Sequence, residues 1–159
     1  MDSPLQTRHR SFALLDHLAR LTRLRAESAL APLGLRPRHL VALTVLRDLG
    51  SPTQQALTAA LRTDRTNLIG LLNELESDSL ILRRRSAEDR RRHFVELTDD
   101  GADRLAEAET ALATAEDEVL AALDADQREA LYQLLAQATT SHVVDCAAAT
   151  AEDLPDGDC

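Results

Sequence analysis

The strongest constraint on the fold is the segment 80–101, in which two apolar runs flank a short polar turn. Residues 80–84 and 92–97 carry the apolar side chains, and residues 83–85 and 90–92 each place three arginines next to the turn. Two short runs of this kind around a polar turn predict a β-hairpin. A hairpin tip with six arginines fits the phosphate backbone and the minor groove of DNA.

The charges of the chain are distributed unevenly. The 159 residues have a net charge of -9, and all 18 basic residues are arginines. Residues 36–98 hold 11 arginines and 8 acidic residues, whereas residues 99–159 hold 2 arginines and 16 acidic residues. Because the local field governs docking on a polyanion, the acidic total does not exclude DNA as a partner. A solvated charge run is the ordinary alternative, but two arginine triplets that converge on one turn favour binding.

The composition predicts a single, mainly helical domain. Aromatic residues make up only 2% of the chain, so leucine and alanine, both strong helix formers, must fill the core. No apolar run approaches the length of a membrane-spanning helix, and residues 1–10 lack an apolar signal core. We therefore expect a cytoplasmic protein without a membrane partner. Cys146 and Cys159 have neither disulfide-framework nor zinc-site spacing.

Helical periodicity marks the first two helices. Leucines at helical spacing predict a helix over residues 9–31, which Pro32 and Gly34 end. Pro37 stands where the first turn of a helix tolerates proline, and Gly50 stops the helix that follows.

Two further helices precede the hairpin. Ser51 or Thr53 can cap a short helix, and a tight break at residues 62–64 follows it. Asp64 is a good cap for the next helix, which runs to about residue 77. Two helices around a tight turn, followed by a hairpin, predict a winged helix-turn-helix over residues 36–98.

The remaining helices flank this unit. Thr98 can cap a long helix from residue 99 to about residue 123, and Asp124 with Gln127 resembles a capping box for a last helix to about residue 144. The helices of residues 9–31 and 99–144 carry more apolar surface than one chain easily covers, which predicts a homodimer interface. An intramolecular bundle is the alternative. Residues 1–146 then form one domain, and the acidic tail 147–159 is expected to be disordered.

The hairpin also resembles the wing of the MarR family of bacterial transcription regulators. The family pattern Asp-x-Arg-x-x-x-apolar-x-Leu-Thr-x-x-Gly stands complete as Asp89, Arg91, Val95, Leu97, Thr98 and Gly101. Residues 75–76, 80–81 and 34–38 resemble further family segments, and the resemblance covers about residues 9–144. It implies a mainly α fold with a small β-hairpin wing, flanked by N- and C-terminal dimerisation helices.

The resemblance also implies a function. Such a chain is expected to be a sequence-specific transcription regulator that binds double-stranded DNA as a homodimer. Its operator is expected to be pseudo-palindromic, and repression is the expected outcome. Family members commonly release DNA when a small ligand binds between the dimer helices and the DNA-binding lobe. We find no cofactor motif and no catalytic constellation, so we do not expect an enzyme. The alternatives are a protein-interaction module on the same scaffold and a zinc-dependent regulator, although the five histidines include no His-x3-His pair.

The candidate DNA-binding residues lie on the fourth helix and on the hairpin. Arg65 can bond guanine and Asn67 can bond adenine, unless Asn67 instead supports the local cap. Arg91, held by Asp89, corresponds to the family's minor-groove arginine, with Arg90 as the alternate. The full set is Arg65, Thr66, Asn67, Gly70, Asn73, Arg84, Arg85, Asp89, Arg90, Arg91 and Arg92. Arg83 is expected to meet phosphate or water, as are Arg84, Arg85 and Arg92.

Two positions depart from the family pattern. Ser79 stands where the family usually has glycine, so that Asp78 or Ser79 must adopt a strained or altered turn. Gly70 stands where many members carry a basic residue, which removes a phosphate contact but lets the helix approach the groove floor. The candidate ligand-binding residues are His9, Arg10, Phe12, His17 and His39; no metal ligands are predicted.

Overall fold

The computed structural model describes residues 11–86, 89 and 92–139. In chain order its elements are α1 (Phe12–Leu30), the short 3-10 turn η1 (Ala31–Leu33), α2 (Pro37–Leu49), α3 (Gln54–Ala60), α4 (Arg65–Ser77), β1 (Ile81–Arg85), β2 (His93–Leu97), α5 (Asp99–Val119) and α6 (Ala125–Thr139). None of the helices in this part of the chain has both the length and the apolar character needed to cross a membrane.

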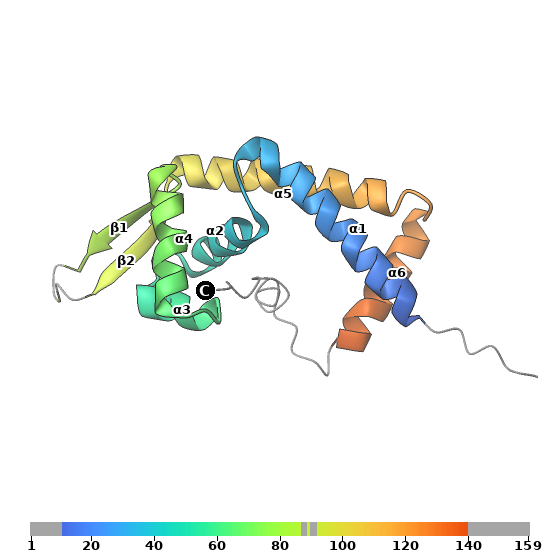
Figure 1. The fold of residues 1–159 in the computed structure, drawn as a ribbon, viewed down its shortest axis with the longest axis horizontal. Helices are drawn as coiled ribbons and strands as arrows, with labels where there is room; N and C mark the ends of the chain where they lie inside the picture. Colours follow the sequence, from blue (N-terminus) through green and yellow to red (C-terminus); the bar gives the residue numbers. More distant parts are fainter. Residues whose placement is uncertain (1–10, 87–88, 90–91, 140–159) are drawn as a thin grey trace, which may run out of the picture.

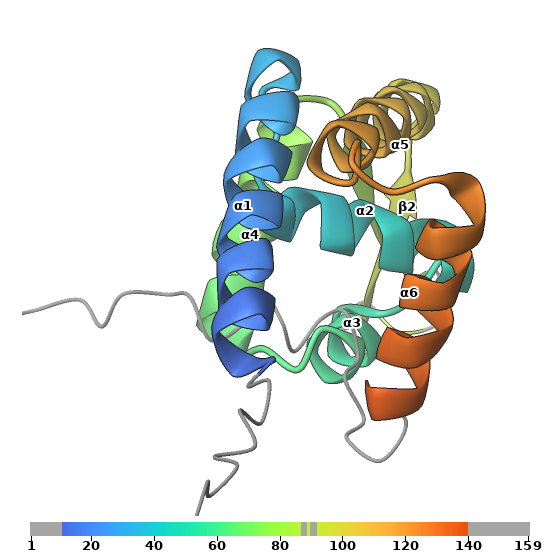
Figure 2. The ribbon, with the colours of Figure 1, turned by 90° about the vertical axis from the view of Figure 1, so that its right-hand side faces the viewer.

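Helix α5 joins two differently built regions (Figure 1). Helices α2, α3 and α4 and the antiparallel β1–β2 hairpin gather at the first half of α5; we call them the winged-helix part. Helices α1 and α6 extend from the other half of α5; in Figure 2, α1 lies to the left of α5 and α6 lies below it. We call α1 and α6 the terminal helices. A winged helix-turn-helix between flanking helices confirms the predicted fold class.

The starts of the helices follow from local sequence. The Thr53 hydroxyl accepts a hydrogen bond from the Ala56 N–H at 3.1 Å and so caps α3. Asp64 caps α4 in the same way, by accepting from the Asn67 N–H at 2.9 Å. These caps satisfy donors that a helix start leaves unpaired. Asp64 therefore acts as predicted, and of the two candidate caps for α3 the structure uses Thr53.

The long helix α5 is capped as expected but is shorter than expected. The Thr98 hydroxyl accepts from the Gly101 N–H. The end predicted near residue 123 is wrong, because α5 ends at Val119 and a tight turn with i to i+3 hydrogen bonds follows. That turn brings Asp124 into place to form the predicted reciprocal capping box with Gln127. The predicted end of the last helix and the tail 147–159 lie outside the described residues.

The hairpin pairs Ile81 with Leu97 and Arg85 with His93. Both strands begin one residue later than predicted. Val95 is fully buried, and its N–H donates to the Pro52 carbonyl at 2.9 Å, which ties the hairpin to the segment before α3. Within β2 only Val95 is buried, and the side chains on either side of it are half-buried.

The core consists mainly of leucines, most of which come from the winged-helix part. The fully buried ones on α2, α3 and α4 are Leu43, Leu46, Leu57, Leu68, Leu72 and Leu75. Helix α5 adds Leu105 to this cluster. By contrast, α6 has no buried residue. The close-packed interior of the chain therefore lies on one side of the molecule.

Special backbone geometry marks the two turns at the ends of α4. Ser79 has a positive φ of 60°, which confirms that this turn needs the left-handed conformation that glycine adopts more easily. Arg62, in the break before α4, also has a positive φ of 47°. Gly101 meets a different demand, since a Cβ there would lie 2.0 Å from the Leu80 carbonyl oxygen. Only glycine lets the first turn of α5 seat against the base of the hairpin.

Candidate nucleic-acid interface

One face of α4 is exposed and polar. Its first turn presents Arg65, Thr66 and Asn67, and further along the same helix Gly70 and Asn73 are exposed. The opposite face carries buried leucines. In Figure 1, α4 rises from α3 and the two strands of the hairpin run back down from the upper end of α4, so the start of α4 and the far ends of the strands lie on one side of the molecule. The structure thus brings the described residues of the two predicted DNA-binding groups to the same side.

Asn67 supports the cap of α4, which is the alternative to a free base-contacting side chain. Its backbone N–H and its Nδ2 both donate to Asp64, the latter at 2.5 Å from Oδ2. The pKa of Asp64 is lowered, first by the Asn67 N–H and further by the Thr66 N–H and the Asn67 side chain. Asp64 therefore stays a carboxylate, and Asn67 stays exposed beside it.

Arg83 differs from its prediction as a residue that meets phosphate or water. Its Nε donates to Glu76 Oε2 at 2.9 Å. Its Nη2 donates to the same carboxylate and to Asn73 Oδ1, the latter at 2.7 Å. The side chain is only 23% exposed. The prediction is wrong because successive side chains of a strand point to opposite faces. The three arginines of residues 83–85 therefore do not form one cluster. Arg83 instead fixes the hairpin to α4.

The arginine–glutamate contact also affects protonation. The hydrogen bond from Arg83 lowers the pKa of Glu76, against a smaller opposing effect of burial. Because the carboxylate stays ionised, it holds the arginine by a charge-assisted hydrogen bond.

The other described wing arginines remain exposed. Arg84 pairs with Glu96 at 3.2 Å, and Arg92 lies 3.9 Å from Asp89. Arg85 is exposed at the end of β1. Surface ion pairs of this kind contribute only about 0–1 kcal/mol, so a phosphate can replace the carboxylate. Arg90 and Arg91 lie outside the described residues, and with them the expected contact between Asp89 and Arg91.

A second contact fixes α4 to α2. His39 is only 4% exposed; its Nδ1 accepts from the Arg36 N–H at 3.2 Å, and its Nε2 lies 2.7 Å from Glu74 Oε2. Since Nδ1 accepts, Nε2 carries the proton and donates to Glu74. Arg38 donates to the same carboxylate at 2.6 Å. The hydrogen bond from His39 and then that from Arg38 lower the pKa of Glu74, while burial opposes them.

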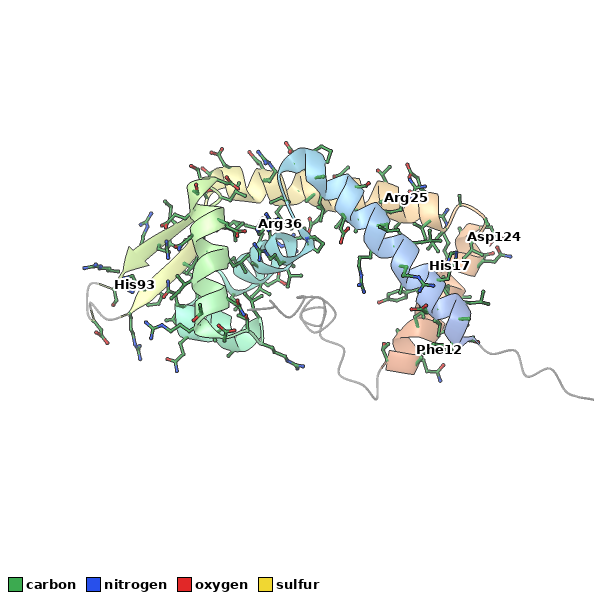
Figure 3. All side chains as sticks on the ribbon, viewed as in Figure 1. Phe12, His17, Arg25, Arg36, His93 and Asp124 are labelled. Carbon is green, nitrogen blue, oxygen red and sulfur yellow. The ribbon has the colours of Figure 1, made fainter. Side chains whose placement is uncertain are left out.

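This contact bears on the candidate ligand residues. Both ring nitrogens of His39 are engaged inside the winged-helix part, so the structure does not leave them available to a ligand. Phe12 and His17 lie on α1 in the region of α6, far from Arg36 at the start of α2 (Figure 3). The structure therefore does not gather these candidates into one site. His9 and Arg10 lie outside the described residues.

A cavity of about 360 Å³ lies between α1, α5 and α6. Its lining is mostly apolar, with Tyr132 of α6 and the charged side chains of Arg25, Glu116 and Arg128. None of the described candidate ligand residues lines it. The sequence does not predict this cavity. Helical periodicity shows which residues form an apolar face, but it does not show where the faces of two helices leave space between them. Within residues 11–86, 89 and 92–139, no group of three or more potential metal-ligating side chains occurs.

Large apolar side chains are exposed on the terminal helices. On α1, Phe12 is 81% exposed, and Leu14 and Leu24 are also exposed; on α6, Tyr132 and Leu134 are each exposed by more than half. Several large apolar side chains exposed on the same two helices are typical of a surface that another molecule covers. The intramolecular bundle considered from the sequence would have covered these side chains, and the described chain does not.

Comparison with known proteins gives consistent matches. Residues 35–93 match the model of the MarR family. A protein from Thauera aromatica, whose name assigns it to transcriptional regulation of the hcr operon, is 32% identical over 102 residues. That match covers 64% of this chain but only 61% of the relative, so the chain spans less than two thirds of its length.

Solved structures match over more of the chain. The apo form of MarR from E. coli is 22% identical, and its structure matches with a TM-score of 0.71. The match covers 87% of this chain and 98% of that one, and it supports the fold. The transcriptional repressor CouR, solved bound to a 23-mer DNA duplex, is 30% identical with a TM-score of 0.69, again over 87% of this chain and 98% of that one.

Proposed function

The chain belongs to the MarR family, and on that premise we propose that it is a DNA-binding transcription regulator that acts as a homodimer. One observation carries the proposal: the exposed start of α4 and the arginine-bearing hairpin lie on the same side of the molecule (Figure 1). A helix-turn-helix presents this end of its second helix to the major groove. CouR, a relative at 30% identity, is a repressor solved with a DNA duplex.

We assign the candidate residues as follows. Arg65 and Thr66 meet base edges or phosphates in the major groove. At Gly70, where an added Cβ would meet nothing within 4 Å, the helix backbone itself faces the groove. On the hairpin, Arg84, Arg85 and Arg92 meet phosphates. Arg91, oriented by Asp89, enters the minor groove, with Arg90 as the alternate.

The second copy follows from the terminal helices. Their exposed apolar side chains gain free energy when another surface excludes water from them. A symmetric pair joined there presents two copies of α4 to one duplex, which suits a pseudo-palindrome with half-sites about one helical turn apart. Repression by blocking polymerase is the expected outcome. The protein then acts in the cytoplasm, as a regulator and not as an enzyme.

A small ligand is proposed to control this arrangement. A ligand that binds better to one spacing of the two DNA-binding lobes shifts the population toward that spacing, and DNA affinity changes accordingly.

The test is selection of bound duplexes from a random-sequence pool, followed by titration of the recovered duplex with salt. The proposal predicts a symmetric site and a steep linear fall of log affinity with log salt, because several phosphate contacts displace counterions. Arg85→Gln should make that slope shallower by about one. Failure to recover any duplex at low salt, or a flat slope, would favour an interaction module that binds protein instead.

A further inference from the structure

The two exposed asparagines of α4 are each held by a charged partner, and the partners have opposite signs. We propose that these partners fix the orientation of both side-chain amides, so that Asn67 presents a hydrogen-bond acceptor to the DNA bases and Asn73 presents a donor. The inference rests on the proposed DNA binding and names the base chemistry that each asparagine would select.

For Asn67 the partner is Asp64. A carboxylate can only accept hydrogen bonds, so the amide nitrogen of Asn67 must face it, as the 2.5 Å distance between Nδ2 and Oδ2 shows. The orientation of an asparagine amide is often ambiguous, but here the chemistry of the partner decides it. The lowered pKa of Asp64 keeps that partner ionised. Oδ1 of Asn67 accepts no hydrogen bond from any described residue, and so remains available.

For Asn73 the partner is Arg83. A guanidinium can only donate, so Oδ1 of Asn73 must face it, and the distance is 2.7 Å. The amide NH2 group therefore lies on the other side of the side chain. Arg83 is itself held by Glu76 through two hydrogen bonds. The arginine is thus fixed in place to orient Asn73.

The two orientations select different bases. An outward acceptor at Asn67 matches the exocyclic amino groups of adenine N6 or cytosine N4 in the major groove. An outward donor at Asn73 matches O6 of guanine or O4 of thymine, where adenine and cytosine carry amino donors instead. The bidentate contact with adenine that is usual for asparagine needs both amide ends. In each case the charged partner already takes one of the two hydrogen-bonding positions at one end, which disfavours that geometry. The two residues are six positions apart, about 9 Å along the helix axis, so they contact different base pairs.

The sharpest variant is Asn73→Asp. An aspartate accepts from Arg83 as the asparagine does but turns an oxygen outward where the NH2 group was. Selection from a random duplex pool, repeated with this variant, should change the preferred base at one position of each half-site from one with an acceptor, guanine or thymine, to cytosine or adenine. The Asn73→Asp variant should bind the duplex selected by the wild type about tenfold more weakly than the duplex with the changed base.

Base analogues test Asn67 separately. In the duplex recovered with the wild type, each adenine or cytosine is replaced in turn by the base that lacks its exocyclic amino group. At one position this replacement should weaken wild-type binding about 3- to 10-fold, the effect of one hydrogen bond, and should leave Asn67→Ala unaffected. Arg85→Gln is the matched control, because loss of a phosphate contact should weaken all duplexes nearly equally.

Three results would overturn the inference. If Asn73→Asp and Asn73→Ala select the same bases as the wild type, Asn73 meets the backbone or nothing. If no amino-group replacement distinguishes the wild type from Asn67→Ala, Asn67 serves only as part of the cap. If the wild type itself selects no duplex, the proposed function fails first and this inference fails with it.

Discussion

The winged-helix part and the terminal helices draw on the same leucine-rich composition but use it differently. In the first, leucines such as Leu43, Leu57 and Leu72 are wholly buried. In the second, Phe12 is 81% exposed and Leu134 is 64% exposed. The first region is therefore stabilised by contacts within the chain. The second completes its apolar contacts only when another surface covers it, and α5, which belongs to both regions, connects them.

The largest expected effect separates the two regions directly. Leu72→Ala leaves a cavity in the buried cluster and should lower the free energy of unfolding by about 2–5 kcal/mol. Leu134→Ala changes an exposed side chain and should leave the stability of the single chain within about 0.5 kcal/mol. Denaturant unfolding at low protein concentration measures both.

The same two variants should reverse their order in association. Leu134→Ala should weaken the homodimer about fivefold or more in sedimentation equilibrium, because truncation of an interface side chain costs about 1 kcal/mol or more at the residues that matter. A dimer unaffected by this change, and by Leu14→Ala or Tyr132→Ala, would show that the apolar face of the terminal helices is not the interface.

The junction between the regions gives the second prediction. At Gly101 an added Cβ meets the Leu80 backbone at 2.0 Å, so Gly101→Ala should lower the free energy of unfolding by about 3 kcal/mol. Gly70→Ala is the matched control, because nothing lies within 4 Å of its added Cβ. There alanine should stabilise α4 by about 1 kcal/mol through helix propensity. Similar thermal midpoints for the two variants would mean that the contact between Gly101 and the Leu80 backbone is not rigid.

What the sequence predicted depends on the range of the interaction. The caps at Thr53, Asp64 and Thr98 were foreseeable because each bonds a backbone group three residues away. The pairing of His39 with Glu74 spans 35 residues and that of Arg83 with Glu76 depends on which face of a strand turns to a helix. Residue type and spacing do not predict such contacts. The sequence therefore predicts the position of α4 in the chain but not the partners of its side chains.

A smaller effect is expected at the turn after α4. Ser79 has a φ of 60°, a conformation that costs most residues more than it costs glycine. Ser79→Gly should therefore raise the free energy of unfolding by about 0.5–1 kcal/mol in the winged-helix part. Ser77→Gly, two residues earlier at the last residue of α4, should instead lower it, because glycine has a lower helix propensity. Chemical denaturation of the two variants side by side would detect opposite signs, and equal signs would contradict the strain at Ser79.

The smallest effect concerns pH. The pKa of Glu74 is lowered from 4.5 by His39 and Arg38, so its ionised form stabilises the folded protein above pH 4.5. This contribution is lost as the pH falls through the lower, folded-state pKa. Glu74→Gln should therefore show a weaker loss of stability below pH 4.5 than the wild type does.

The matched control for this measurement is Glu129→Gln on the exposed α6, which removes one carboxylate without touching the contact between α2 and α4. Unfolding titrations at a series of pH values provide the comparison. Parallel curves for Glu74→Gln and the wild type would mean that the contact between α2 and α4 does not contribute to acid stability.

The most direct test of the whole scheme is the mass of the complex formed on the duplex recovered by selection. If the terminal helices pair two copies and each copy presents α4 and its hairpin, native mass spectrometry should show two 17.4 kDa chains on one duplex, with no stable complex of a single chain. A complex with one chain, or a duplex that stays unbound at low salt, would contradict it.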